Sequence, residues 1–258
     1  MDDVQVQLSK YPFPSPDLVR IEESDVVFKP PLYPLEIGVL RGERVQLVPL
    51  DPEIHARPLY SLFNTPKPLS DALYSSAQMI YGPFEDEQSF KSFLKGKTYL
   101  EDPSTIMFVV VESSTRSALG MISLLDTQLF NRKVEIGHLM FHPSTRGRRI
   151  PTEASLLLLD LCFGTGTNQG GLCGEKDFRR VQWKCGHLNS NSAAMALSLG
   201  MKFEGTLRSF MSFPDGRERD CMFFSLLESE WKQGGKRELV YNKVMESVHK
   251  ERGDGPGC

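Results

Sequence analysis

One stretch of the sequence, residues 134–161, constrains the fold most strongly because three different patterns follow one another in it. Residues 134–141 are mostly apolar or β-branched, with one glycine, and predict a strand. Residues 142–149, called the basic loop below, contain three arginines, and residues 150–161 are rich in helix-forming leucine. Strand, loop and helix are therefore predicted in that order, with Pro151 in the first helical turn, where its missing N–H is not needed.

The predicted helix starts without a side-chain cap, because the expected N-cap residue, Ile150, has no oxygen to offer. Free backbone N–H groups of residues 148–150, the positive end of the helix dipole and the guanidinium groups of Arg146, Arg148 and Arg149 would then face one spot. A phosphate or diphosphate suits such a spot. A solvated basic loop that binds nothing remains the alternative.

A second block, residues 179–205, follows the first along the chain. Residues 179–185 alternate like a strand, and a predicted helix beginning near Asn189 leads to a Leu199–Gly200 turn and then to Glu204–Gly205. Together the two blocks resemble the acetyl-CoA signature of the GNAT N-acetyltransferase superfamily, in the branch related to the Rim-type ribosomal-protein N-terminal acetyltransferases. The resemblance runs roughly over residues 41–231.

The loop of this family reads Gln/Arg-x-x-Gly-x-Gly/Ala, and its backbone amides hold the coenzyme A diphosphate. Arg146 matches the first position, whereas Arg149 and Pro151 stand where the family has glycine and a small residue. The resemblance implies an α/β GNAT fold with a mixed, mainly antiparallel sheet of about seven strands flanked by helices. It implies acetyl-CoA as co-substrate and direct transfer of the acetyl group to a primary amine. The coenzyme-binding residues that it implies are Leu139, Met140, Arg146, Gly147, Arg148, Arg149, Ile150, Pro151, Thr152, Asn189 and Ser192.

Acetyl transfer to an amine needs a proton acceptor and a stabilised oxyanion. In the family, a bulge in the strand before the loop points an amide at the acetyl carbonyl, which here corresponds to Leu139 and Met140, just after Gly137. Glu135 is the preferred base, acting through water. Strand alternation places His138 on the opposite face, as a core histidine.

The reaction also needs a proton donor for the departing thiolate. The tyrosine that many family members use for this is replaced here by Ala196. The resemblance then suggests Ser192 as the acid and Asn189 near the pantetheine arm, although Asn189 is also a natural helix N-cap. Asp220 is a further catalytic candidate, and its alternative is an ion pair with a neighbouring arginine.

The chain divides into a proline-rich arm (residues 1–40), the acetyltransferase domain (41–232) and a C-terminal helix and tail (233–258). The arm is expected to lie along the domain or a second subunit, and the tail helix to dock through residues spaced four apart. Within the domain the patterns predict a first strand over 41–50, hairpins over 106–124 and 203–227, and a glycine-rich insertion over 164–174.

Composition limits the function. A formal net charge of −3 and a pI near 6.0 argue against general nucleic-acid binding. No apolar run of membrane-spanning length and no signal-peptide pattern occur in the sequence, so a cytoplasmic protein without membrane contact is expected. The five cysteines show no C-x-x-C spacing, so we expect reduced thiols and no metal site.

Two functional hypotheses remain. The first is an N-acetyltransferase, a monomer or homodimer, whose amine acceptor is a small molecule more readily than a protein N-terminus. The second is a non-catalytic acyl-CoA-binding regulatory module of the same fold, which the loss of the tyrosine acid and the two loop departures favour.

Overall fold

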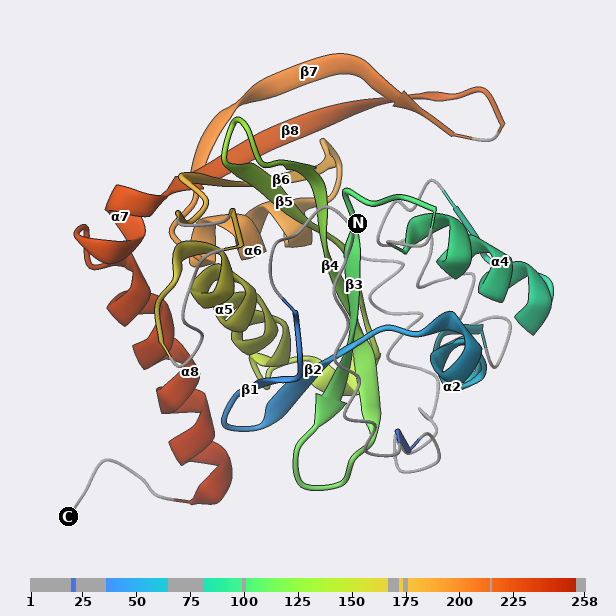
Figure 1. The fold of residues 1–258 in the computed structure, drawn as a ribbon, viewed down its shortest axis with the longest axis horizontal. Helices are drawn as coiled ribbons and strands as arrows, with labels where there is room; N and C mark the ends of the chain where they lie inside the picture. Colours follow the sequence, from blue (N-terminus) through green and yellow to red (C-terminus); the bar gives the residue numbers. More distant parts are fainter. Residues whose placement is uncertain are drawn as a thin grey trace.

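The computed structural model describes residues 20–21, 36–64, 81–98, 101–166, 172–173, 176–213 and 215–253. Its centre is an eight-stranded sheet in the order β1-β2-β3-β4-β5-β6-β8-β7 (Figure 1). Neighbouring strands are antiparallel except β5 and β6, which are parallel. The strands are β1 (Leu40–Arg41), β2 (Val45–Pro49), β3 (Ile106–Glu112), β4 (Ala118–Gln128), β5 (Lys133–Phe141), β6 (Arg180–Gly186), β7 (Lys202–Ser212) and β8 (Glu218–Leu227). The helices are α2 (Pro52–Asn64), α4 (Glu87–Lys97), the 3₁₀ turn η2 (Pro143–Thr145), α5 (Ile150–Phe163), α6 (Ser190–Ser198), α7 (Glu228–Lys232) and α8 (Lys236–Arg252).

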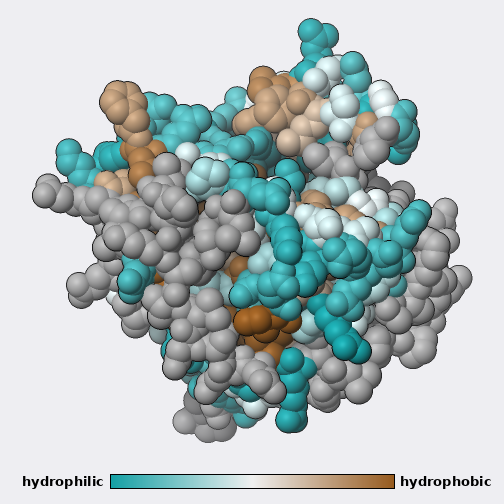
Figure 2. All heavy atoms as spheres, turned by 45° about the vertical axis from the view of Figure 1, so that its right-hand side comes forward, coloured by the Kyte–Doolittle hydropathy of each residue, from teal (hydrophilic) through white to brown (hydrophobic). Residues whose placement is uncertain are grey.

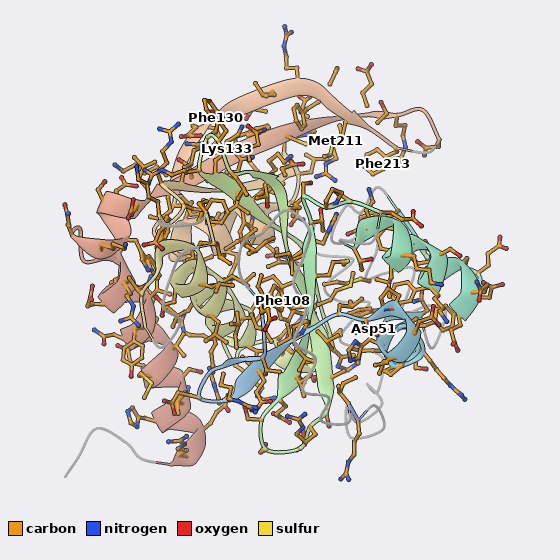
Figure 3. The ribbon with its side chains drawn as sticks, in the orientation of Figure 1. Asp51, Phe108, Phe130, Lys133, Met211 and Phe213 are labelled. Atoms are coloured by element: carbon orange, nitrogen blue, oxygen red, sulfur yellow. The ribbon has the colours of Figure 1, made fainter. Side chains whose placement is uncertain are left out.

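The sheet has an apolar core on each face. α5 and α8 pack on one face, and α2 and α4 on the other (Figure 1). β3 supplies both cores in alternation: Phe108, near the centre of Figure 3, belongs to the α5 side and Val109 to the α2 side. A strand buried on both faces reads as a continuous apolar run, which explains residues 106–111.

Two helices begin where the sequence supplies caps. Asp51, labelled at the start of α2 in Figure 3, accepts a hydrogen bond from the backbone N–H of Glu53 at 2.8 Å. Asp86 accepts the N–H of Ser89 at 2.7 Å, and the Ser89 hydroxyl accepts the N–H of Asp86, which makes a capping box for α4. Both helices therefore begin at a residue whose side chain accepts a free N–H group of the first turn.

The strand predicted over residues 41–50 is confirmed over Val45–Pro49, but its beginning is wrong, because the chain turns back at Gly42 to form the β1–β2 hairpin. The N–H of Gly42 donates to the carbonyl of Val45 at 2.8 Å. The carboxylate of Glu153, on α5, accepts the N–H groups of Arg44 at 2.8 Å and Val45 at 3.3 Å. The turn therefore depends on a buried acid more than a hundred residues away, which local sequence does not reveal.

The C-terminal helix α8 is part of the same core. Val240, Val244 and Val248, spaced four apart, are buried beside residues of α5. The predicted docking helix is confirmed. Among the described residues, no helix has both the length and the apolar character needed to cross a membrane.

The predicted N-terminal arm lies mostly outside the described residues. Where it is described, Arg20 forms a β-bridge with Ser117 and Ile21 is buried, so this part lies on the domain. Much of the predicted insertion, residues 167–171 and 174, also lies outside the described residues.

The β7–β8 hairpin forms the far edge of the sheet, and both of its strands were predicted. β7 is exposed along most of its length, including Phe203, Leu207 and Phe210. In Figure 2 hydrophobic side chains appear in separate places on the upper part of the molecule, where this hairpin lies, and in a further patch near the centre of the face, while the other coloured atoms are mainly hydrophilic.

β5 contains the bulge that the resemblance implies. Gly137 pairs with Ser123 of β4, and Met140 pairs with Met121, so β5 holds one residue more than β4 between these pairs. His138 takes the left-handed conformation there, with φ of +48°. Because β6 pairs with β5 only as far as Glu135, the two strands diverge from the bulge onward.

Gly120 of β4 faces the bulged segment at very close range, since an added Cβ would lie 2.4 Å from the carbonyl oxygen of Met140. We expect Gly120→Ala to destabilise the fold by about 1–3 kcal/mol, seen as a lower Tm, because the backbone must shift. The control is Gly96→Ala in α4, whose Cβ would meet its nearest atom at 3.5 Å. It should raise stability by up to ~1 kcal/mol. An unchanged Tm for Gly120→Ala would contradict this close approach.

Candidate active site

Two adjoining pockets lie on either side of the start of α5. The first, the loop pocket, has a volume of about 490 Å³ and lies between the basic loop and α5. The second, the splay pocket, has a volume of about 410 Å³ and lies where β5 and β6 diverge. Phe141, Pro151 and Met195 line both pockets, so the two pockets are neighbours.

Unpaired backbone donors lie in the basic loop and at the start of α5, beside the loop pocket. Arg149 is the N-cap residue of α5, with φ of +53° and no side-chain cap, and Ile150 is the first helical residue. The uncapped start is confirmed, whereas the predicted N-cap, Ile150, is wrong by one residue. Among the described residues, the N–H groups of Gly147, Arg149 and Ile150 have no hydrogen-bond partner. The N–H of Arg148 does have one, because it donates to the carbonyl of Thr145.

Two of the three predicted arginines line this pocket. Arg146 and Arg149 line it, are exposed and make no ion pair with any described residue. Arg148 instead pairs with Glu112 at 2.7 Å and Glu251 at 3.3 Å, and does not line either pocket. Three arginines were expected to face one spot, but only Arg146 and Arg149 line the loop pocket.

Glu135 is the buried acid of the splay pocket. Only 4 % of its surface is exposed, and its Oε2 lies 2.9 Å from Nζ of Lys184 on β6. Burial raises the pKa of Glu135 to about 7, although the neighbouring Lys184 acts to lower it. Asp126 shares the same ammonium group at 2.7 Å. A carboxyl group with this pKa can exchange a proton near neutral pH.

His138 lines the same pocket as Glu135, so the prediction that it lies on the opposite face is wrong. The bulge is the reason, because one extra residue reverses the alternation of side chains. Val134 and Ile136 face the α5 core before the bulge, whereas Leu139 and Phe141 pack against that core after it. The His138 ring lies 5.9 Å from the Tyr81 ring, and burial lowers its pKa to about 4, so it is neutral at pH 7.

Ser192 and Asn189 also line the splay pocket, at the start of α6. Asn189 caps this helix by accepting the N–H of Ser192 at 3.1 Å, which confirms the capping hypothesis. The Ser192 hydroxyl accepts the indole N–H of Trp183 at 2.9 Å. Because the indole can only donate, the hydroxyl keeps its own hydrogen, and the neighbouring Cys185 side chain also hydrogen-bonds with this hydroxyl.

The remaining predicted residues lie in different parts of the structure. Asp220 does not line either pocket, and its carboxylate accepts the N–H of Ser209 at 2.8 Å, where β7 bulges against β8. Met140 is buried in the α2-side core, and Ala196 in the α5-side core. Leu139 lines the splay pocket and Thr152 the loop pocket.

Several pocket residues were not identified from the sequence, above all Lys184. Its position beside Glu135 follows from the parallel register of β5 and β6, in which Glu135 pairs with Gln182. Met211, which comes from the β7–β8 hairpin (Figure 3), also lines the splay pocket. Pairing between strands that are distant in sequence brings Lys184 and Met211 into the splay pocket, and no local sequence pattern encodes this pairing.

Comparison with known proteins agrees with this geometry. Residues 44–202, more than half of the chain, match the acetyltransferase (GNAT) domain family. A probable GNAT-family acetyltransferase from Chromobacterium violaceum is 36 % identical, with 75 % of this chain and 87 % of that chain covered and a TM-score of 0.62. A GCN5-related N-acetyltransferase from Brucella melitensis is 24 % identical, with 80 % and 85 % covered and a TM-score of 0.68. No curated protein sequence matches the chain.

A more distant neighbour is RimL, a ribosomal L7/L12 α-N-protein acetyltransferase solved in complex with coenzyme A. It is 15 % identical, with 73 % of this chain and 97 % of that chain covered and a TM-score of 0.56, and so shows a shared fold. The family match, the 36 % identity and the eight-stranded mixed sheet agree with one another. The chain belongs to the GNAT acetyltransferase family.

Proposed function

We propose that this protein is an acetyl-CoA-dependent N-acetyltransferase that moves an acetyl group directly to a primary amine. One observation carries the proposal: the loop pocket, with its unpaired donors and guanidinium groups, adjoins a pocket that holds a carboxyl group with a pKa of about 7. An anion-binding pocket and a proton-accepting pocket thus adjoin each other. This arrangement suits a donor that carries its phosphates away from its reactive carbonyl.

The residues of the loop pocket fit a diphosphate. The N–H groups of Gly147, Arg149 and Ile150 supply hydrogen bonds, and the start of α5 supplies the positive end of a helix dipole. The guanidinium groups of Arg146 and Arg149 add charge-assisted bonds, which are stronger than bonds between neutral groups. Thr152 and Pro151 would contact the adjoining part of the coenzyme.

Glu135 acts as the base in this proposal. A protonated amine cannot attack a thioester, so the acceptor must lose a proton before or during attack. The ionised carboxylate of Glu135 accepts that proton through a bridging water, and Lys184 stabilises the ionised form. Neutral His138, whose Nδ1 is buried without a hydrogen-bond partner among the described residues, lies beside this path.

The bulge and Ser192 complete the chemistry. The attack makes a tetrahedral oxyanion, and the backbone amide of Leu139 would donate to it, since Leu139 has no paired residue on β4, whereas Met140 pairs with Met121. Collapse of this intermediate expels the coenzyme thiolate. The Ser192 hydroxyl, which keeps its hydrogen while accepting from Trp183, would protonate the thiolate.

The acceptor is proposed to be a primary amine of a small molecule, because the splay pocket is a compact space of about 410 Å³. The fold shared with RimL supports a protein N-terminus as the second candidate. In either case the amine would enter past the β7–β8 hairpin, which contributes Met211 and Arg219 to the pocket.

An amine panel tests the proposal. The protein is incubated with acetyl-CoA and with small primary amines or peptides bearing free N-termini, and the released thiol and acetylated product are measured. We expect thiol release that depends on the amine and equals the product formed. Calorimetric binding of acetyl-CoA without turnover of any amine would instead favour the non-catalytic acyl-CoA-binding module.

A further inference from the structure

We propose that the C-terminal helix α8 positions the basic loop for coenzyme binding, with Glu251 and Ser247 as the positioning residues. The inference rests on the proposed function. It concerns a helix that lies outside the region matched to the acetyltransferase family, residues 44–202. Neither residue lines either pocket, so both would act through Arg148.

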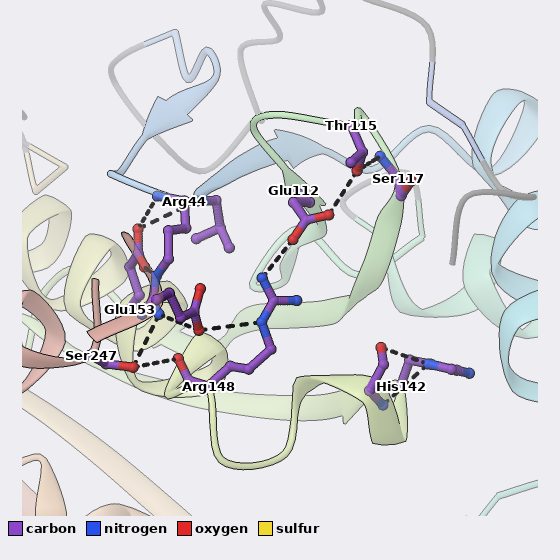
Figure 4. Close-up of polar contacts among 11 residues, drawn as sticks. Arg44, Glu112, Thr115, Ser117, His142, Arg148, Glu153 and Ser247 are labelled. Carbon is purple, nitrogen blue, oxygen red and sulfur yellow. Dashed lines mark hydrogen bonds and ion pairs between the residues drawn. The ribbon is translucent and has the colours of Figure 1, made fainter. Parts of the chain in front are cut away.

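The end of α8 holds Arg148 by both its backbone and its side chain (Figure 4). The Ser247 hydroxyl donates to the carbonyl oxygen of Arg148 at 3.1 Å. The Glu251 carboxylate accepts from Nε of Arg148 at 3.3 Å, while Glu112 at the end of β3 accepts from its NH2 at 2.7 Å. Arg148 is thereby fixed between two elements that are distant in sequence, and its charge is directed away from the loop pocket.

The same helix end is tied to the first turn of α5. Arg44 donates to Glu251 at 3.0 Å and to Ser247 at 3.1 Å, and its Nε lies 2.9 Å from Oε2 of Glu153. Glu153 is only 2 % exposed, and the side chain of Arg44 is 9 % exposed. A pair this deeply buried holds its geometry because separating it would leave a charge desolvated and alone.

These contacts enclose the part of the loop where the unpaired donors lie. Arg148 stands between Gly147 and Arg149, both in the left-handed conformation, and the N–H groups of these two neighbours have no hydrogen-bond partner among the described residues. A residue fixed at its carbonyl and at its side chain sets the orientation of the peptide units on both sides. Because α8 already orders the loop before a ligand binds, diphosphate binding does not have to offset a loss of conformational entropy in the loop.

Donor selectivity separates this role from general stabilisation. Acetyl-CoA carries the diphosphate, whereas acetyl-pantetheine presents the same thioester without it. Loosening the loop should therefore impair use of the first donor and leave use of the second unchanged. A variant that merely destabilises the fold would lose activity with both donors in equal proportion.

The test uses the full chain with the double substitution Glu251→Gln and Ser247→Ala. We expect its KM for acetyl-CoA to rise roughly tenfold, from the loss of hydrogen bonds to a charged group, with kcat within about twofold of the wild type. The kcat/KM with acetyl-pantetheine should stay the same. The matched control is Glu246→Gln, an exposed carboxylate on the same helix with no ion pair to any described residue, and it should behave as the wild type.

An unchanged KM for acetyl-CoA, or equal losses with both donors, would overturn the inference. Calorimetric titration with CoA gives a second readout that needs no acceptor. If the wild type binds CoA but acetylates no amine, the proposed function fails. The positioning role is then still decided by whether the double variant binds CoA about tenfold more weakly.

Discussion

Glu135→Gln is expected to lower kcat by about 10²–10⁴-fold, the range for loss of a general base, while the affinity for CoA stays unchanged. The substitution keeps the shape of the side chain but removes its ability to accept a proton. The measurement is steady-state turnover with a responsive amine, together with calorimetric CoA binding. The matched control is Glu238→Gln, an exposed carboxylate on α8, which should leave kcat as it is. Full activity of Glu135→Gln would remove Glu135 from the mechanism.

The pH dependence of kcat/KM provides a second test of the role of Glu135. Because burial raises the pKa of Glu135 to about 7, its carboxyl group is protonated and inactive as a base below that value. The kcat/KM should therefore rise with pH through about 7 as the carboxylate forms. Lys184→Met removes the cation that lowers this pKa, so the midpoint should move to higher pH. A midpoint that stays in place would mean that another group titrates.

Replacing both Arg146 and Arg149 by Glu is expected to weaken CoA binding by about 100-fold or more. Each guanidinium offers charge-assisted bonds to phosphate, and each reversal sets a carboxylate against the same anion. Neither side chain pairs with a described residue, so the fold should keep its Tm. Calorimetry with CoA gives the affinity, and Arg57→Glu, an exposed arginine of α2, is the control. Undiminished affinity in the double variant would mean that the loop pocket is not the phosphate site.

The elements of the fold were largely predictable, because local patterns encode them. The strand, basic loop and helix of residues 134–161, both hairpins and the caps at Asp51 and Asp86 follow from periodicity and from residues within a few positions. The beginning of the first strand was not predictable from local sequence, because the turn at Gly42 depends on hydrogen bonds to Glu153, which lies more than a hundred residues later in the sequence.

The candidate site was predictable as a region but not in its details. The extra residue of the β5 bulge decides on which face of the sheet His138 lies. The alternation of side chains along the sequence of β5 does not show that this extra residue is present. The basic character of Arg148 is plain in the sequence. Its partner Glu251, 103 residues later, is identified only when α8 packs against the loop. Lys184 reaches Glu135 only through the register of two parallel strands.

The central claim is that the uncapped start of α5 binds the diphosphate of coenzyme A through its backbone donors. The most direct test is to follow backbone amide chemical shifts by NMR while CoA, and separately pantetheine, is added to the full chain. We expect the amides of Gly147, Arg149 and Ile150 to shift with CoA and to stay in place with pantetheine. Binding of CoA that leaves these three amides unmoved, or that moves them no more than pantetheine does, would contradict the claim.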